Sequence, residues 1–137
     1  MYDVAAAIRS YLLSKDAIRD IVGQRIYADA LPQNATLPAI EMVVLDDTPE
    51  MQLSDITGLT KARIQFVCHG ATRRTTRQIA QAIRTCGVAA LKGLSSGVWI
   101  KGVAPERSFD DSIPPTDGND THRYLTTVDL VVDYLEA

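Results

Sequence analysis

The side chains best suited to metal binding or nucleophilic catalysis are two histidines, His69 and His122, and two cysteines, Cys68 and Cys86. Together they could in principle bind zinc. However, Cys68 and His69 are adjacent on a predicted strand, so their side chains should point to opposite faces. The same geometry argues against a Cys–His nucleophile pair. We therefore expect two structural, reduced and mostly buried cysteines, a histidine at a strand end, and neither metal nor cofactor.

Paired carboxylates occur at Asp46-Asp47 and Asp110-Asp111. Such pairs can act in acid–base or metal chemistry. Here each pair lies in a polar segment that contains proline, which favours a solvated loop. The sequence also lacks the GxSxG, GxGxxG and GxxxxGK[ST] motifs of serine hydrolases and nucleotide-binding proteins. We therefore expect that the protein is not an enzyme. The alternative that stays open is an enzyme that uses the carboxylates of these loops.

Apolar spacing predicts two helices that would support these residues. The first covers residues 2–22 with a break near Ser14. Gly23 follows it and suits a C-terminal cap with positive φ. The second begins after Thr72, which is a good N-cap, and its apolar stripe can extend past Gly87.

Four strands are predicted at residues 39–45, 59–69, 98–103 and 123–135. Residues 46–57 read as a loop or a hairpin tip, and residues 106–121 read as a second long loop. We expect Trp99 to pack in the core. The fold class is therefore α+β: an antiparallel sheet of about four strands, with two helices packed on one face and a long hairpin loop. Residues 1–137 should form a single domain.

Composition narrows the protein class. The chain has 137 residues, of which 46% are hydrophobic and 23% charged, with a net charge of −3. These values predict a soluble intracellular domain. Two cysteines are too few for a disulfide scaffold, the N-terminus has no signal-peptide pattern, and no apolar run approaches the roughly 18 residues of a membrane span. A domain that mainly binds nucleic acid would normally be basic.

Charge is unevenly distributed along the chain. Residues 46–57 hold four acids and no base, and residues 106–121 hold five acids against Arg107. Six bases and no acid lie between Lys61 and Arg84. These are either ordinary solvated faces or the acidic and basic sides of a molecule that associates head-to-tail into a ring. Such an interface would use Asp46, Asp47, Glu50, Asp110, Asp111, Arg73, Arg74 and Arg77.

The chain resembles the tail-completion, or tail-terminator, family of long-tailed bacteriophages. The resemblance is carried by Gly23-Gln24-Arg25-Ile26-Tyr27, Leu31-Pro32, Leu37-Pro38-Ala39-Ile40, Thr48-Pro49-Glu50, the segment 58–66, Gly97-Val98-Trp99-Ile100 and His122-Arg123-Tyr124. These segments occur in the family's order over nearly the whole chain. The run from Gly23 to Ile40 is the most specific.

The resemblance implies a structural virion protein that forms a hexameric ring on the end of the tail tube. Such a ring stops tube polymerisation and offers a surface to head-completion or connector proteins. Implied partners are therefore the chain itself, the major tail-tube protein and the head-completion protein, at the head-proximal end of a tail assembled in the host bacterial cytoplasm. Phage DNA would pass through the ring without specific binding, and acidic loops would repel its phosphates. The alternative is a small monomeric protein-binding module of phage or prophage origin.

Overall fold

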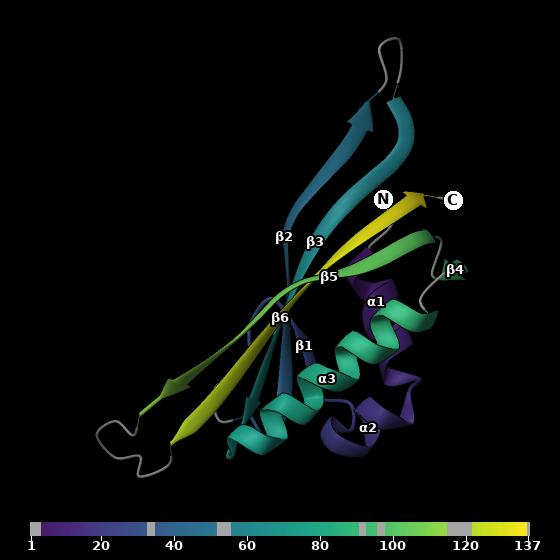
Figure 1. The fold of residues 1–137 in the computed structure, drawn as a ribbon. Coiled ribbons are helices and arrows are strands. Elements are labelled where there is room, and N and C mark those ends of the chain that lie inside the picture. Colours follow the sequence, from purple (N-terminus) through teal and green to yellow (C-terminus); the bar gives the residue numbers. More distant parts are fainter. Residues whose placement is uncertain are drawn as a thin grey trace.

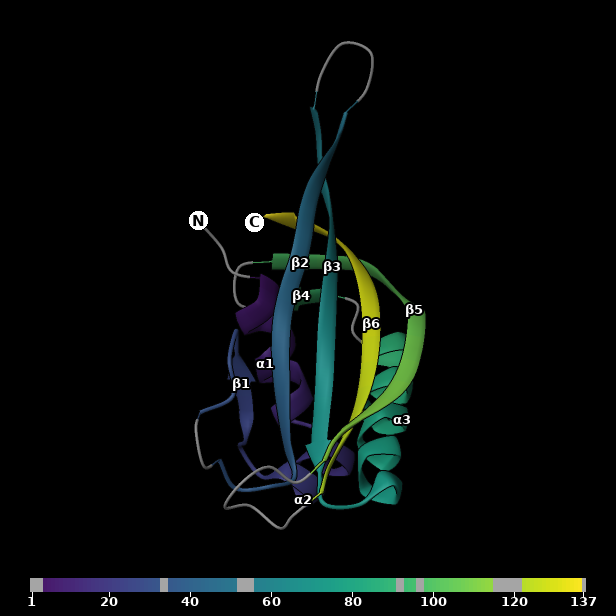
Figure 2. The ribbon, with the colours of Figure 1, turned by 90° about the vertical axis from the view of Figure 1, so that its left-hand side faces the viewer.

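The computed structural model describes residues 4–32, 35–51, 56–90, 93–95, 98–114 and 122–136. Two layers are visible in Figures 1 and 2, a strongly twisted sheet and a layer of helices on one of its faces. The helices are α1 (Val4–Leu13), α2 (Asp16–Val22) and α3 (Arg73–Ala90). The strands are β1 (Ile26–Ala28), β2 (Ala39–Met51), β3 (Ile56–Gly70), β4 (Gly93–Ser95), β5 (Val98–Ile113) and β6 (Arg123–Glu136).

The sheet has six strands in the order β1-β2-β3-β6-β5-β4. Its centre is the predicted set of four antiparallel strands, since β2 pairs with β3, β3 with β6, and β6 with β5. The two short edge strands were not predicted. Strand β1 pairs in parallel with β2, so the sheet is mixed, and β4 pairs with the first residues of β5.

The helices follow the predicted pattern closely. The first predicted helix is divided into α1 and α2, and the break falls at Ser14 and Lys15. Gly23 ends α2 with φ of 61° and donates its N–H to the carbonyl of Arg19. At the start of α3, the Thr72 hydroxyl accepts a hydrogen bond from the Thr75 N–H at 3.2 Å. Helix α3 continues through Gly87 to Ala90.

The core lies between the sheet and the helices. Alternate residues of β3, from Ala62 to Cys68, are fully buried, as the period-two pattern predicts. The corresponding face of β6 buries Val128, Leu130 and Val132. Helices α1 and α3 cover these residues with side chains such as Ile8, Leu12, Ile79 and Ile83.

Two hairpins extend beyond the helical layer, in opposite directions (Figure 1). The β2–β3 hairpin continues past the end of β6, because Leu59 is the last β3 residue that pairs with β6. The β5–β6 hairpin pairs as far as Ile113 with Arg123. We call these the β2–β3 arm (residues 48–51 and 56–60) and the β5–β6 arm (residues 108–113 and 123–127).

These arms correct two predictions. Residues 46–51 belong to β2 and residues 106–113 to β5, so these parts of the predicted loops are strand. Polar composition and proline favoured loops, but β-bulges after Val44 and Pro105 accommodate the irregular residues within the strands. Residues 52–55 and 115–121 lie outside the described residues.

Candidate functional site

A hydrogen-bonded cluster fixes the N-terminal half of α3 against β5 and β6. Asp110 accepts hydrogen bonds from the Arg77 guanidinium at 2.6 Å and from the Thr126 hydroxyl at 2.8 Å. The Thr126 hydroxyl also lies 2.8 Å from the hydroxyl of Thr76, which is fully buried on α3. The hydrogen bond from Arg77 is the largest of the effects that lower the pKa of Asp110. Asp110 is therefore a charged anchor for the helix.

Arg73 is a second anchor at the same end of α3. Its guanidinium donates hydrogen bonds to the backbone carbonyls of Leu125 on β6 and Asp111 on β5. It also lies 3.4 Å from the Asp110 carboxylate and 5.1 Å from the centroid of the Tyr124 ring. Arg73 thus contacts both strands of the β5–β6 arm and holds the arm to the helix.

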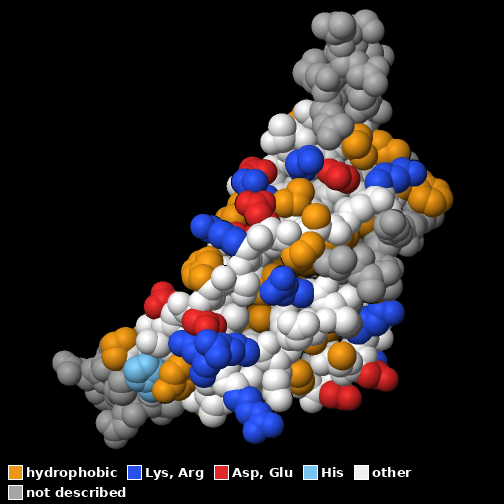
Figure 3. Space-filling view, viewed as in Figure 1, with side chains coloured by type: hydrophobic (Ala, Val, Ile, Leu, Met, Phe, Trp, Pro, Cys, Tyr) orange, Lys and Arg blue, Asp and Glu red, His pale blue; other side chains and the backbone are white. Residues whose placement is uncertain are grey.

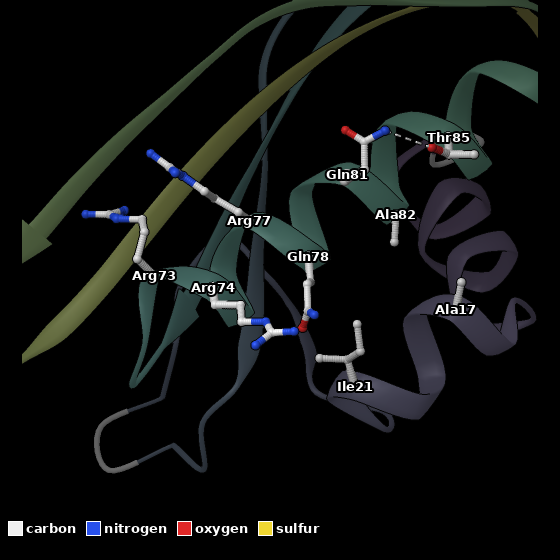
Figure 4. Close-up of a pocket in the computed structure, with 9 residues that line it drawn as sticks. All are labelled: Ala17, Ile21, Arg73, Arg74, Arg77, Gln78, Gln81, Ala82 and Thr85. Atoms are coloured by element: carbon white, nitrogen blue, oxygen red, sulfur yellow. Dashed lines mark hydrogen bonds between the residues drawn. The ribbon is translucent and has the colours of Figure 1, made fainter.

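Arg74 differs from its two neighbours. Its side chain makes no hydrogen bond or ion pair with any residue in the described part of the chain. Figure 4 shows Arg73 and Arg77 pointing toward the strands, whereas Arg74 points toward Gln78 and Ile21. Arg74 is exposed and carries an uncompensated positive charge on the helical side of the molecule.

Arg74 lies at one end of an open groove between α2 and α3 (Figure 4). The groove has a volume of about 990 Å³. Its apolar floor is made by small or partly exposed side chains of the two helices, which are Ala17, Ile21 and Ala82. No acid is among the lining residues, which also include Arg73, Arg77, Gln78, Gln81 and Thr85. The groove is therefore apolar along its floor and basic at one end.

Of the remaining predicted interface acids, Glu50 and Asp111 lie on the arms, and Asp46 and Asp47 lie in β2 just before the β2–β3 arm. Asp46 lies 3.1 Å from Arg63, and Asp47 accepts a hydrogen bond from the Tyr134 hydroxyl. Glu50 lies in β2 within the β2–β3 arm. The exposed Asp111 carboxylate accepts only the N–H of Ser112, at 2.8 Å, and it has no basic partner among the described residues. Asp110 and Asp111 point to opposite faces of β5, because successive strand residues alternate.

The sheet face opposite the helices carries paired charges. Arg63 lies between Asp46 and Glu106, and the hydrogen bond with Glu106 is the largest of the effects that raise its pKa. Arg107 pairs with the buried Asp129 at 2.9 Å. On the side of the molecule that Figure 3 shows, acidic and basic side chains also lie close together. Charges that are separated in the sequence are therefore close together in space.

The candidate metal ligands do not form a site in the described residues. No group of three or more His, Cys, Asp or Glu side chains there could hold a metal ion. Cys68 is fully buried, as predicted, and burial raises the pKa of its thiol. His69 pairs with Glu41 at 3.2 Å, and the side chain of Cys86 lies outside the described residues. Among the described helices, none is long and apolar enough to cross a membrane.

The exposure of several large apolar side chains was not predicted from the sequence. Trp99 is 42% exposed, so its predicted place in the core is wrong. Val98 and Ile100 take the core positions on either side of it, and Trp99 stands on the other face beside Lys101. Phe109 and Ile113 are 41% and 42% exposed on the β5–β6 arm. Phe109 and Ile113 lie four residues apart after Pro105, which is compatible with one face of a strand, but residues 106–121 were interpreted as a loop.

Comparisons with known proteins give matches of two different kinds. A family model described as "Tail completion protein gp17" matches residues 6–95. A chain of the solved structure "Virion of native gene transfer agent (GTA) particle" matches with a TM-score of 0.69 and 16% sequence identity. That match covers 96% of this chain and 94% of the other, and at this identity it shows a shared fold. A search of curated proteins gave no match.

Proposed function

The chain belongs to the tail completion protein family whose model it matches over residues 6–95, and from this premise we propose that it caps the end of a phage tail tube. The cap is a hexameric ring of this chain. It ends tube polymerisation and provides the surface that joins the tail to the head. The family match is the observation that supports this proposal most directly.

The shape of the molecule is consistent with this role. Two arms extend in opposite directions from one body (Figure 1), so a single chain can contact different neighbours at its two ends. The arms carry exposed polar and apolar side chains, among them Asp111, Phe109 and Ile113. A structural role uses such surfaces directly and needs no catalytic group. We propose the major tail-tube protein and the head-completion protein as the partners, with DNA passing through the ring without specific binding.

The candidate interface residues retain a place in this proposal. Asp46, Asp47, Glu50, Asp110, Asp111, Arg73, Arg74 and Arg77 all lie on the two arms, beside them, or on the adjacent end of α3. Asp110, Arg73 and Arg77 hold the β5–β6 arm in place within one chain. We propose that the others face neighbouring subunits, the tube or the head, at the head-proximal end of the tail.

The test is assembly of tail tubes with and without this chain. Negative-stain images should show one ring-shaped cap per tube when the chain is present, and overlong tubes when it is absent. Tubes of normal length that form without the chain would contradict the proposal. A monomeric protein-binding module, the alternative function, would bind its partner in a one-to-one complex and leave tube length unchanged.

A further inference from the structure

We propose that the ring is closed by one repeated contact, in which the β5–β6 arm of each copy docks into the α2–α3 groove of the next. This inference rests on the proposed function, because it names the interface between subunits of the cap. The arm supplies Phe109, Asp111 and Ile113. The groove supplies its apolar floor and the guanidinium of Arg74.

The arm carries an exposed stripe of suitable chemistry. Phe109, Asp111 and Ile113 are alternate residues of β5, so they share one face of the strand. Phe109 and Ile113 are two of the four large apolar residues that are exposed among the described residues. Asp111 lies between them and has no basic partner in the described part of the chain. The stripe therefore reads apolar, acidic, apolar.

The groove has the complementary pattern. Ala17, Ile21 and Ala82 offer an apolar floor, which two large side chains of a neighbour can cover. Arg74 is the lining arginine that lacks a partner among the described residues, since Arg73 and Arg77 are paired with Asp110. A carboxylate between two apolar side chains satisfies this surface in both charge and polarity. Asp111 of a second copy is such a group.

We expect copies of the chain to associate through this groove and not by pairing of their open strand edges. Beyond the short strands β1 and β4, much of β2 and β5 has no neighbouring strand on its outer side within the described residues. However, both strands contain a β-bulge and a proline, at Pro49 and Pro105. Bulges and prolines are features that discourage strand addition at sheet edges. The contact also joins two different patches of the chain, so it is head-to-tail. Head-to-tail contacts generate closed rings when the rotation per copy closes.

The test uses two complementary charge reversals, Arg74→Asp and Asp111→Arg. Each variant alone places like charges together at every interface of the ring, so capped tubes should decrease at least about tenfold. A 1:1 mixture should restore capping, because the two variants can alternate around the ring. At one interface Asp at position 74 then meets Arg at position 111, and at the next interface the native Arg74 meets the native Asp111. Native mass spectrometry should show equal numbers of the two chains in each ring.

Mixing separates this contact from a role within one chain, which a second copy cannot rescue. Lys101→Asp is the control, since Lys101 is exposed on β5 and belongs neither to the groove nor to the β5–β6 arm. All variants should unfold at the temperature of the native protein, because Arg74 and Asp111 are exposed and have no charged partner among the described residues.

The possible outcomes test the proposed contact between copies and the proposed capping function separately. Normal capping by either variant alone, or failure of the mixture to cap while both chains remain folded, overturns the contact and leaves the capping proposal intact. Absence of a ring with the native chain overturns both. A ring of alternating chains that caps tubes supports both.

Discussion

Asp110 and Asp111 are adjacent on β5 but make different contacts. Asp110 holds α3 to the β5–β6 arm through Arg77, Arg73 and Thr126. Asp111, the next residue, faces the opposite side of β5 and is free of a basic partner within the described residues. Two acids that look equivalent in the sequence therefore differ: Asp110 is paired within the chain, and Asp111 is the one that the proposed contact assigns to a neighbour.

The two acids should respond differently to substitution. Asp110→Asn should lower the free energy of unfolding at pH 7 by about 0.5–1.5 kcal/mol, since it weakens exposed ion pairs and a hydrogen bond to Thr126. Asp111→Asn should leave stability nearly unchanged. Denaturant unfolding of both variants measures this difference.

The pH dependence of Asp110 provides a second check. Because the folded state lowers the pKa of Asp110, its stabilising effect is present above the unfolded pKa of about 4 and is lost as pH falls further. The native protein and Asp110→Asn should therefore converge in stability toward pH 3. A constant difference at all pH values would mean that the carboxylate charge does not matter.

His69 should make the protein less stable in weak acid. Burial lowers the pKa of His69, and this effect exceeds the opposing hydrogen bond with Glu41. The unfolded chain then binds a proton more readily than the folded chain below about pH 6.5, so stability should decrease from pH 7.5 to 5.5.

Replacing the histidines separates the source of this effect. His69→Gln should flatten the stability curve over this pH range, as measured by thermal unfolding. His122→Gln is the control, since His122 lies at the start of β6 and contacts Tyr124. An equally steep curve in His69→Gln would assign the acid sensitivity to other groups.

At the scale of elements, local patterns predicted the central strands and the helices. Period-two alternation in β3 and β6 and the apolar spacing in α1, α2 and α3 reflect burial on one face, which the sequence records directly. The arms were missed because their β2 and β5 residues are exposed where the structure describes them, at 48–49 and 108–113, so no buried face imposes an apolar alternation. Their polar residues and prolines then look like loops.

The candidate site was predicted only in part for a related reason. The acids and arginines were visible as charge blocks, but their pairing across β5, β6 and α3 depends on long-range register. The groove was not visible at all, because Ala17, Ile21 and Ala82 read as ordinary residues of an apolar stripe. Only the packing of α2 against α3 leaves these small side chains partly open.

The β2–β3 arm should be dispensable for folding. Within the described part of the arm, Leu59 and Thr60 are the residues that pair with β6, and no arm residue whose side chain is described is among the buried core residues. Thr48 pairs with Lys61, and a two-residue Asn-Gly turn can join these residues directly once residues 49–60 are removed. We expect the shortened chain to fold with a melting temperature close to that of the native protein.

Removal of the β2–β3 arm should affect assembly of the cap but not folding of the chain. The shortened chain should still form rings, since the docking contact proposed above lies elsewhere, but it should fail to cap tubes or to join heads. Size-exclusion chromatography and negative-stain imaging distinguish these steps. If the shortened chain caps and joins normally, the arm is not a contact for the tube or the head.

At the scale of the whole molecule, association must be restricted to one geometry. A chain with long open strands could add to others edge to edge, and such contacts lead to open filaments. Bulges and prolines in β2 and β5 oppose that outcome. The head-to-tail contact between an arm and a groove then remains as a route to a closed assembly. In the proposed contact, the pair of Asp111 and Arg74 would set the register, and Phe109 and Ile113 would cover the apolar floor of the groove.

The combination of a charged pair and apolar residues in the proposed contact predicts how capping depends on salt. An exposed ion pair contributes at most about 1 kcal/mol and is screened at high ionic strength, but a ring repeats it at every interface. Raising NaCl from about 50 to about 500 mM should therefore decrease the fraction of capped tubes. Thermal unfolding of the free chain should change little over the same range, because its core is apolar.

A neutral variant isolates the electrostatic part of this effect. In Arg74→Gln/Asp111→Asn the apolar contact through Phe109 and Ile113 remains, whereas the charged pair is absent. Capping by this variant should be weaker than native capping at low salt, and nearly independent of salt. Counting capped tubes across a salt series for both proteins measures the difference. Equal salt dependence in the two proteins would assign the charge effect to the contact with the tube, since the interface between copies would then contain no effective ion pair.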